Sequence, residues 1–169
     1  LYQKAIDYVF EGDIPEGSLI LDLFCGTGTI GQLIAHQNKE KYGRSVVIIG
    51  VDIVEEAIEN AAANAEKNNI EGLRFHAADV GKFLLEFPEY KGKINTIVLD
   101  PPRSGITPKS LQRIIALNAP RIVYVSCNPA TQARDQEELR KAGYSFTKLS
   151  FVDQFPHTAH VEAIGVFEK

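Results

Sequence analysis

The stretch LDLFCGTGTIG, from Leu21 to Gly31, decides the fold of this chain. Its apolar first half predicts a buried strand, and its glycines Gly26, Gly28 and Gly31 have the spacing G-x-G-x-x-G. Glycines allow a tight turn and a close approach of a ligand to the backbone, and the following helix offers its N-terminus to anionic groups. This spacing is typical of nucleotide-binding turns, including those of nicotinamide and flavin enzymes. We therefore expect a nucleotide-like ligand where this strand ends.

Strand-like and helical patterns alternate along the rest of the chain. Several strand-like runs are continuous in Val, Ile and Leu, as expected when helices cover both faces of a parallel sheet. No helical pattern separates the last two strands, so they are expected to form an antiparallel hairpin connected by residues 154–159. The pattern predicts an α/β fold with a doubly wound, mostly parallel seven-stranded sheet. The expected strands span residues 18–24, 46–52, 73–77, 94–100, 121–126, 146–153 and 160–167, and the expected helices span residues 2–10, 30–37, 54–68, 80–87, 108–118 and 129–142.

Composition limits the class of protein. The 169 residues are 44% hydrophobic and 24% charged, which predicts one globular domain, residues 1–169, with its own core. The longest apolar run, residues 46–54, is too short to span a bilayer, no signal peptide opens the chain, and two cysteines fit the reducing cytoplasm. The chain has no methionine, not even at position 1, so we expect it to be a fragment of a longer protein. Its oligomeric state stays open.

The net charge of −4 is a poor electrostatic footprint for nucleic acid, but the charges are unevenly distributed. No acidic residue occurs between positions 101 and 134, whereas five basic residues do, and these are Arg103, Lys109, Arg113, Arg121 and Arg134. A basic segment of this kind is either a solvated face or part of a nucleic-acid contact.

Three acidic residues near strand ends narrow the choice of ligand. Asp22 stands four residues before Gly26, and this acid-x-x-x-Gly-x-Gly turn resembles the S-adenosylmethionine (SAM) loop of class I methyltransferases, whose Rossmann-like fold also has five alternating units and a final hairpin. Asp52 can accept both ribose hydroxyls of a nucleoside, which suits NAD and SAM equally. Asp79 can accept a hydrogen bond from an adenine amino group, or simply cap the next helix.

The fourth strand ends in Asp100-Pro101-Pro102-Arg103. A carboxylate followed by two residues of fixed φ predicts a rigid loop that holds polar groups beside a reacting centre. Oxidoreductase chemistry does not require such a loop. Amino-directed methyltransferases carry an aromatic residue after the prolines to stack a base, whereas Arg103 suits a phosphate, a uracil carbonyl or a structural carboxylate.

The fifth strand ends in Ser126-Cys127-Asn128-Pro129. Asn128 and Pro129 predict a helix start, which places the Cys127 thiol near a helix N-terminus within the basic segment, and we expect both features to lower its pKa and favour the thiolate nucleophile. Cys25, inside the glycine turn, is expected only to pack. His157 and His160 have no further metal-ligand cluster beside them, so no metal is expected.

Five motifs together resemble one family, the SAM-dependent RNA (uracil-5-)-methyltransferases. They follow the family order from about residue 19 to the end of the chain, and DPPR, SCNP and HVE are the specific parts. The motifs are LDLFCGTGTIG, GVDIVEEAIENA, LDPPRSG, VYVSCNP and FPHTAHVEA. RNA cytosine-5 methyltransferases also use cysteine chemistry, but they carry a cysteine in the fourth-strand loop, where this chain has none.

The resemblance implies a role for each motif residue. Cys127 would add to uracil C6, Glu162 would remove the C5 proton, and Arg103 and Asn128 would bind the RNA substrate, a uridine of rRNA or tRNA. The residues implied to bind SAM are Phe24, Gly26, Gly28, Thr29, Asp52, Asp79 and Asp100. The family's upstream glutamine segment, RNA-binding domain and iron–sulfur cysteines are absent from this sequence, so RNA affinity is expected to depend on other parts of the protein. A SAM-dependent methyltransferase with another substrate, a binding module without turnover, and a nicotinamide enzyme stay open.

Overall fold

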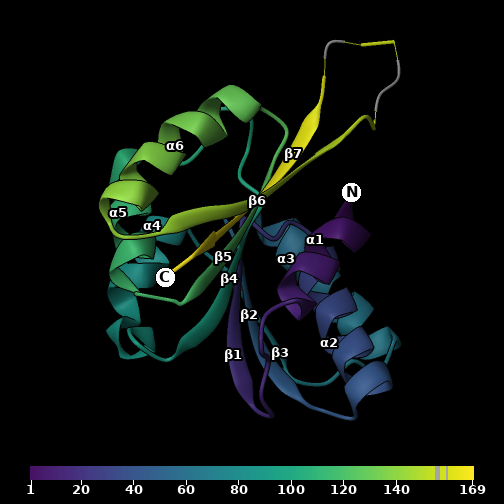
Figure 1. The fold of residues 1–169 in the computed structure, drawn as a ribbon. Helices are drawn as coiled ribbons and strands as arrows, with labels where there is room; N and C mark the ends of the chain where they lie inside the picture. The colour runs from purple at the N-terminus through teal and green to yellow at the C-terminus, as the bar shows by residue number, and fades with distance from the viewer. Residues whose placement is uncertain (155–156, 159) are drawn as a thin grey trace.

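The computed structural model describes residues 1–154, 157–158 and 160–169. These residues form a seven-stranded sheet with helices on both faces, and the strand order is β3-β2-β1-β4-β5-β7-β6 (Figure 1). The elements, in chain order, are α1 (Tyr2–Phe10), β1 (Ser18–Leu23), α2 (Thr29–Tyr42), β2 (Val46–Asp52), α3 (Glu55–Lys67), β3 (Leu73–Ala77), α4 (Val80–Glu86), the 3-10 turn η1 (Pro88–Tyr90), β4 (Ile94–Leu99), α5 (Pro108–Ala116), β5 (Arg121–Ser126), α6 (Pro129–Lys141), β6 (Ser145–Val152) and β7 (Glu162–Glu168).

The sheet combines parallel and antiparallel pairing. Strands β1 to β5 pair in parallel, whereas β7 runs antiparallel to both β5 and β6. The predicted doubly wound sheet with a C-terminal hairpin is therefore confirmed. Part of the predicted hairpin connection, namely Phe155, Pro156 and Ala159, lies outside the described residues.

Apolar side chains fill both faces of the sheet. One cluster packs the α4, α5 and α6 face and includes Leu23, Phe83 and Tyr124, all at most 1% exposed. The other packs the face covered by α1 and α2 and includes Ile6 and Ile34. Burial on both faces explains why β5 is buried along its whole length and why its sequence does not alternate.

The boundaries differ from the predictions in two informative places. Helix α2 continues to Tyr42 instead of ending at residue 37, because no helix breaker occurs before Gly43, which ends the helix with φ +63°. The buried Asn38 also donates a hydrogen bond of 2.8 Å to the Arg44 carbonyl and so holds the last turn. Strand β1 ends at Leu23, one residue early, because Phe24 adopts φ +63° and begins the glycine turn.

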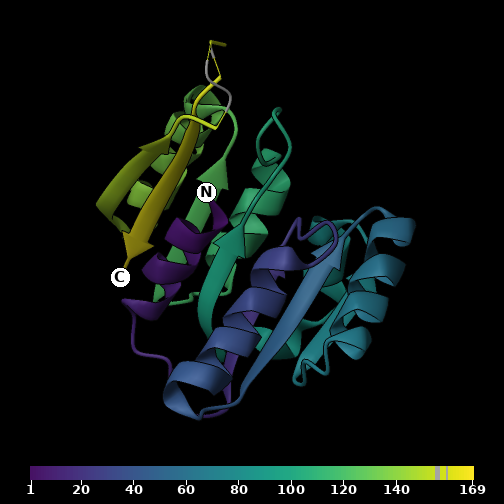
Figure 2. The ribbon, with the colours of Figure 1, turned by 90° about the vertical axis from the view of Figure 1, so that its right-hand side faces the viewer.

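The loops that carry the predicted site residues lie at one edge of the sheet. In Figure 2 the arrowheads of the parallel strands point the same way, and the N-terminus of α1 lies at that same end. The loops that follow β1, β2, β4 and β5 therefore meet where open α/β sheets bind ligands. No helix of the described ranges is long and apolar enough to cross a membrane.

Candidate active site

The glycine turn after β1 is held by the neighbouring strand. The backbone N–H groups of Phe24 and Cys25 both donate to the Val51 carbonyl, at 2.8 and 3.1 Å. Gly26 and Gly28 have φ of +52° and +69°, a region that side-chain-bearing residues seldom adopt. A Cβ at Gly26 would meet no atom within 4 Å, which leaves open space over the turn.

Gly28 has a packing requirement that its motif did not predict, and its cofactor-binding role stays a prediction. A Cβ there would approach the Phe75 ring to 2.5 Å, so the glycine is needed for the packing of β3 against the turn. Cys25 also lies under the turn, because a Cβ at Gly50 would come within 3.0 Å of its Sγ. Burial raises the pKa of the Cys25 thiol, in agreement with the packing role predicted for it.

Two carboxylates brace the same turn. Asp52 accepts hydrogen bonds from the N–H groups of Gly26 and Val54, at 2.8 and 2.9 Å. Asp22 is 1% exposed and accepts a 2.9 Å bond from Gly31 N–H through Oδ2. Its Oδ1 is buried without a hydrogen-bond partner among the described residues. Burial, together with the nearby charges of Asp100 and Asp52, raises the pKa of Asp22 to about 7.

Two adjoining cavities lie along this edge and share Phe24 and Asp100. One, of about 390 Å³, is lined by polar and apolar groups that suit a nucleoside: Phe24, Asp52, Ile53, Val54, Asp79, Val80, Asp100, Pro101 and Pro102. The other, of about 240 Å³, is more polar and is lined by Tyr2, Phe24, Cys25, Gly26, Thr27, Thr29, Ile30 and Asp100. We name the two cavities after the parts of SAM that they are expected to bind, so the first is the nucleoside half and the second is the amino-acid half. Together they contain every predicted cofactor residue except Gly28.

The two remaining acids of the cavities differ in their surroundings. Asp79 caps α4 by accepting a 2.9 Å hydrogen bond from Lys82 N–H, which confirms the capping role. It also lines the nucleoside half, and its contact with an adenine stays a prediction. Burial and the nearby Glu162 raise the pKa of Asp100 to about 6, although a hydrogen bond with Tyr2 opposes the rise.

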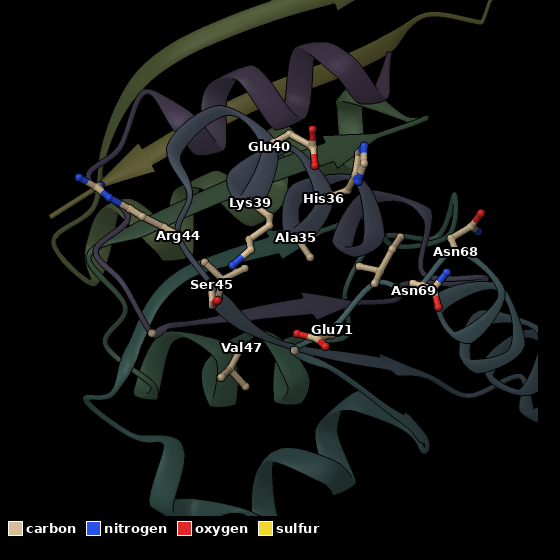
Figure 3. A pocket seen from close by; sticks show the side chains of 14 residues that line it. Ala35, His36, Lys39, Glu40, Arg44, Ser45, Val47, Asn68, Asn69 and Glu71 are labelled. Atoms are coloured by element: carbon tan, nitrogen blue, oxygen red, sulfur yellow. The ribbon is translucent and has the colours of Figure 1, made fainter.

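A larger cavity of about 450 Å³ lies elsewhere, beside the second half of α2 (Figure 3). Its lining includes side chains of both charges, such as Lys39, Arg44 and Glu71, and none of the residues that the motifs single out. It also lies at the amino ends of β2 and β3, away from the edge where such sheets bind ligands. The candidate site is therefore at the carboxyl edge of the sheet.

Cys127 and Glu162 are brought together by strand pairing. Strands β5 and β7 pair Ser126 with Ala163, so the next residues on the two antiparallel chains, Cys127 and Glu162, stand beside each other. The Ser126 hydroxyl fixes the turn, since it donates to the Asn128 carbonyl at 2.9 Å and accepts from Asn128 N–H at 3.1 Å. A thiol and a carboxylate thus lie next to Asp100, which adjoins both cavities.

The prediction that the surroundings lower the pKa of Cys127 is wrong. Desolvation and the charge of Glu162 raise its pKa, and Arg103 opposes them only in part. Helix α6 begins at Pro129, after the Asn128 cap, so the thiol lies outside its first turn. Sequence position relative to a helix start did not reveal the carboxylate that β7 brings across.

Arg103 and Asn128 form side-chain contacts that connect three loops. An Arg103 guanidinium nitrogen lies 2.7 Å from His160 Nδ1, and Asn128 Nδ2 donates to the Arg103 carbonyl at 3.1 Å. Asn128 also caps α6 through Oδ1, which accepts a 3.2 Å bond from Ala130 N–H. Because an arginine is always a donor, Arg103 donates this hydrogen bond. The substrate-binding role of Arg103 and Asn128 stays a prediction.

No role was predicted for two residues of this edge, Tyr2 and Ser126. Tyr2 lies four residues before the buried Ile6 and seven before Val9, so its place on the inward face of α1 was readable from helical spacing. Ser126 directly precedes the cysteine, where a hydroxyl is typical of a turn that bonds its own backbone. Among the described residues no group of three potential metal ligands occurs.

The fold and the cavities at this edge are typical of Rossmann-like α/β proteins, which bind nucleoside-containing ligands at the carboxyl ends of their strands. A family profile described as "Methyltransferase domain" matches residues 14–157. The chain belongs to this methyltransferase family.

The proteins with similar sequences include RNA methyltransferases. The chain is 43% identical over 169 residues to an uncharacterized RNA methyltransferase of Clostridium acetobutylicum, covering 100% of this chain and 34% of that protein. It is 38% identical over 168 residues to the 23S rRNA (uracil(1939)-C(5))-methyltransferase RlmD of Shewanella denitrificans, covering 99% of this chain and 34% of the relative.

One solved structure is similar in both sequence and fold. It is the tRNA (uracil-54, C5)-methyltransferase of Pyrococcus abyssi in complex with S-adenosyl-L-homocysteine, with a TM-score of 0.77 and 34% identity, covering 98% of this chain and 38% of that one. The chain therefore spans about a third of the length of these relatives.

Proposed function

We propose that this chain is the catalytic domain of a longer RNA methyltransferase that uses SAM to methylate C5 of uracil. The observation that carries the proposal is the proximity of Cys127 and Glu162 to each other and to Asp100, which lines both cavities. The relatives named as uracil-C5 methyltransferases support the choice of base and atom.

The cavities fit SAM in shape and chemistry. Asp52 and Asp79 line the half that suits a ribose and an adenine, between apolar groups such as Ile53 and Val80. The carboxylate of Asp100 lines the amino-acid half and provides an acceptor for the positive charge of the amino-acid end, and the buried Asp22 adds a second carboxyl group near Asp100. Bound SAM supplies an electrophilic methyl group.

Cys127 and Glu162 have the chemistry that uracil C5 requires, because C5 alone is a poor nucleophile. The Cys127 thiolate forms an S–C6 bond and moves the C5–C6 π pair onto C5. C5 then forms a bond to the methyl group, whose bond to the sulfonium sulfur breaks and leaves its electron pair on that sulfur. Glu162 removes the C5 proton, and the electron pair of the C5–H bond re-forms the C5–C6 double bond. The S–C6 bond breaks at the same time and releases the thiolate. A nucleophile thus divides one difficult substitution into easier steps.

The RNA must present an unstacked uridine, because C6 is not accessible within a stacked base. Arg103 lies beside Cys127 and can bind a phosphate or a uracil carbonyl. We place this activity on rRNA or tRNA in the cytoplasm, where both cysteines stay free thiols. With a net charge of −4, this chain is expected to share RNA binding with the rest of the longer protein.

The proposal is tested by tritium release from RNA labelled at uracil C5, with pooled tRNA and rRNA transcripts and added SAM. We expect SAM-dependent release that Cys127→Ala abolishes and that Ser145→Ala, a control at the exposed start of β6, retains. SAM binding must persist in Cys127→Ala, which separates loss of chemistry from loss of folding.

Release that persists in Cys127→Ala overturns the cysteine mechanism. Methyl transfer to RNA without tritium release assigns the enzyme another substrate atom. SAM binding without transfer to any RNA, by a protein extended to the full length of its relatives, identifies a binding module.

A further inference from the structure

Tyr2 reaches the candidate site from a helix that none of the motifs includes. It begins α1 and keeps 39% of its surface exposed, yet it lines the amino-acid half with Phe24, Gly26 and Asp100. The helix is firmly seated, because Ala5, Ile6 and Val9 are fully buried against the sheet and α2. The position of Tyr2 is thus set by the core.

The Tyr2 phenol faces a group of acids. It hydrogen-bonds to the Asp100 carboxyl group, and burial together with the charges of Asp100, Glu162 and Asp22 raises the pKa of Tyr2. A phenol with a raised pKa keeps its proton at neutral pH and acts as a donor. Among the residues that line the amino-acid half there is no lysine or arginine to perform this task.

Asp100 needs such a donor. The charge of Glu162 from β7 disfavours a negative charge on Asp100, and Asp100 in turn lies near enough to Asp22 of β1 to raise the pKa of that carboxyl group. Burial acts in the same direction and brings the pKa of Asp100 to about 6, even with the hydrogen bond from Tyr2, which lowers it. Without that bond, the carboxyl group would be partly protonated near neutral pH.

We propose that Tyr2 is a cofactor-positioning residue, whose hydroxyl orients the Asp100 carboxylate in the amino-acid half that both side chains line. This inference rests on the proposed function in taking SAM as the ligand. The ionised Asp100 then attracts the positive charge of SAM, so Tyr2 acts on affinity through Asp100.

The test compares Tyr2→Phe, which removes only the hydroxyl, with Tyr42→Phe as a matched control on the exposed end of α2. Calorimetry would give Kd for SAM and for S-adenosylhomocysteine between pH 6 and pH 8. We expect Tyr2→Phe to weaken SAM binding about threefold to tenfold at pH 6 and much less at pH 8, since a pKa change of one unit shifts the ionised fraction up to tenfold. The loss for S-adenosylhomocysteine, which lacks the sulfonium charge, is expected to be smaller.

A merely structural role for Tyr2 would give the same loss at both pH values, and that result overturns the inference, as does an unchanged Kd. In an Asp100→Asn background, Tyr2→Phe should lose its pH dependence, and retention of it also contradicts a role through Asp100. If the parent chain binds SAM but methylates no uridine, the proposed function fails while the Tyr2 result stands. If the parent chain binds no SAM, both fail.

Discussion

At the residue scale, Cys127 lies between groups of opposite effect. Glu162 and desolvation raise its pKa, whereas the guanidinium of Arg103 lowers it. The position of Arg103 depends in turn on His160 and Asn128, which hold its side chain and its backbone. The free protein therefore keeps a largely protonated thiol at neutral pH, and the rate of nucleophilic attack should rise as the pH increases.

Opposite shifts in thiol reactivity should follow from removing each charge. Arg103→Gln is expected to slow alkylation of Cys127 by iodoacetamide at pH 8, and Glu162→Gln to accelerate it, each about threefold to tenfold for a pKa shift of up to one unit. Peptide mass spectrometry would measure the rate at Cys127 separately from that at Cys25, the internal control. If both variants changed the rate in the same direction, charge would not be what sets this pKa.

At the element scale, the turn after β1 is shaped by packing as much as by ligand binding. Gly28 has the left-handed conformation and lies against Phe75, whereas Gly43 at the end of α2 has a similar φ of +63° and nothing near its Cβ position. The motif spacing correctly predicted a tight turn here. It could not distinguish the need for a left-handed backbone from the need for space beside a ring, because Phe75 comes from β3.

These two glycines form a matched pair. Gly43→Ala should lower the free energy of unfolding by about 1 kcal/mol, the cost of the left-handed conformation alone. Gly28→Ala should lower it by about 2 to 4 kcal/mol, because the methyl group must also displace the Phe75 ring. Urea denaturation of both variants measures the difference, and equal losses would show that the ring moves aside freely.

At the scale of the whole molecule, the sequence predicted the fold and the edge that carries the site, because periodicity and strand ends are local properties. The hairpin of β6 and β7 was readable from the missing helix between them. The contacts between residues that are distant in the chain could not be read from the sequence. The register of β5 and β7 sets Glu162 beside Cys127, and α1 brings Tyr2 to Asp100. The pKa of Cys127 was misjudged for that reason.

The same concentration of acids should make the stability of the ligand-free protein depend on pH in an unusual direction. Asp22 and Asp100 have folded-state pKa values of about 7 and about 6, above the ordinary 3.8, so between pH 4 and pH 7 the native state binds more protons than the unfolded chain. Their contribution to the free energy of unfolding is therefore fully present below pH 4 and is lost as the pH rises to 7.

Asp22→Asn removes the larger of these two titrations. Urea denaturation should show the variant more stable than the parent by about 4 kcal/mol at pH 8 and no more stable at pH 4, with the exposed Asp13→Asn as control. A gain of equal size at both pH values would mean that the buried charge of Asp22 is not its source. SAM should reduce the difference in the free energy of unfolding between variant and parent at pH 8, because its positive charge offsets the ionised Asp22 of the parent. The variant should also bind SAM more weakly than the parent. The free protein would thus retain a destabilising carboxylate because the ligand needs it.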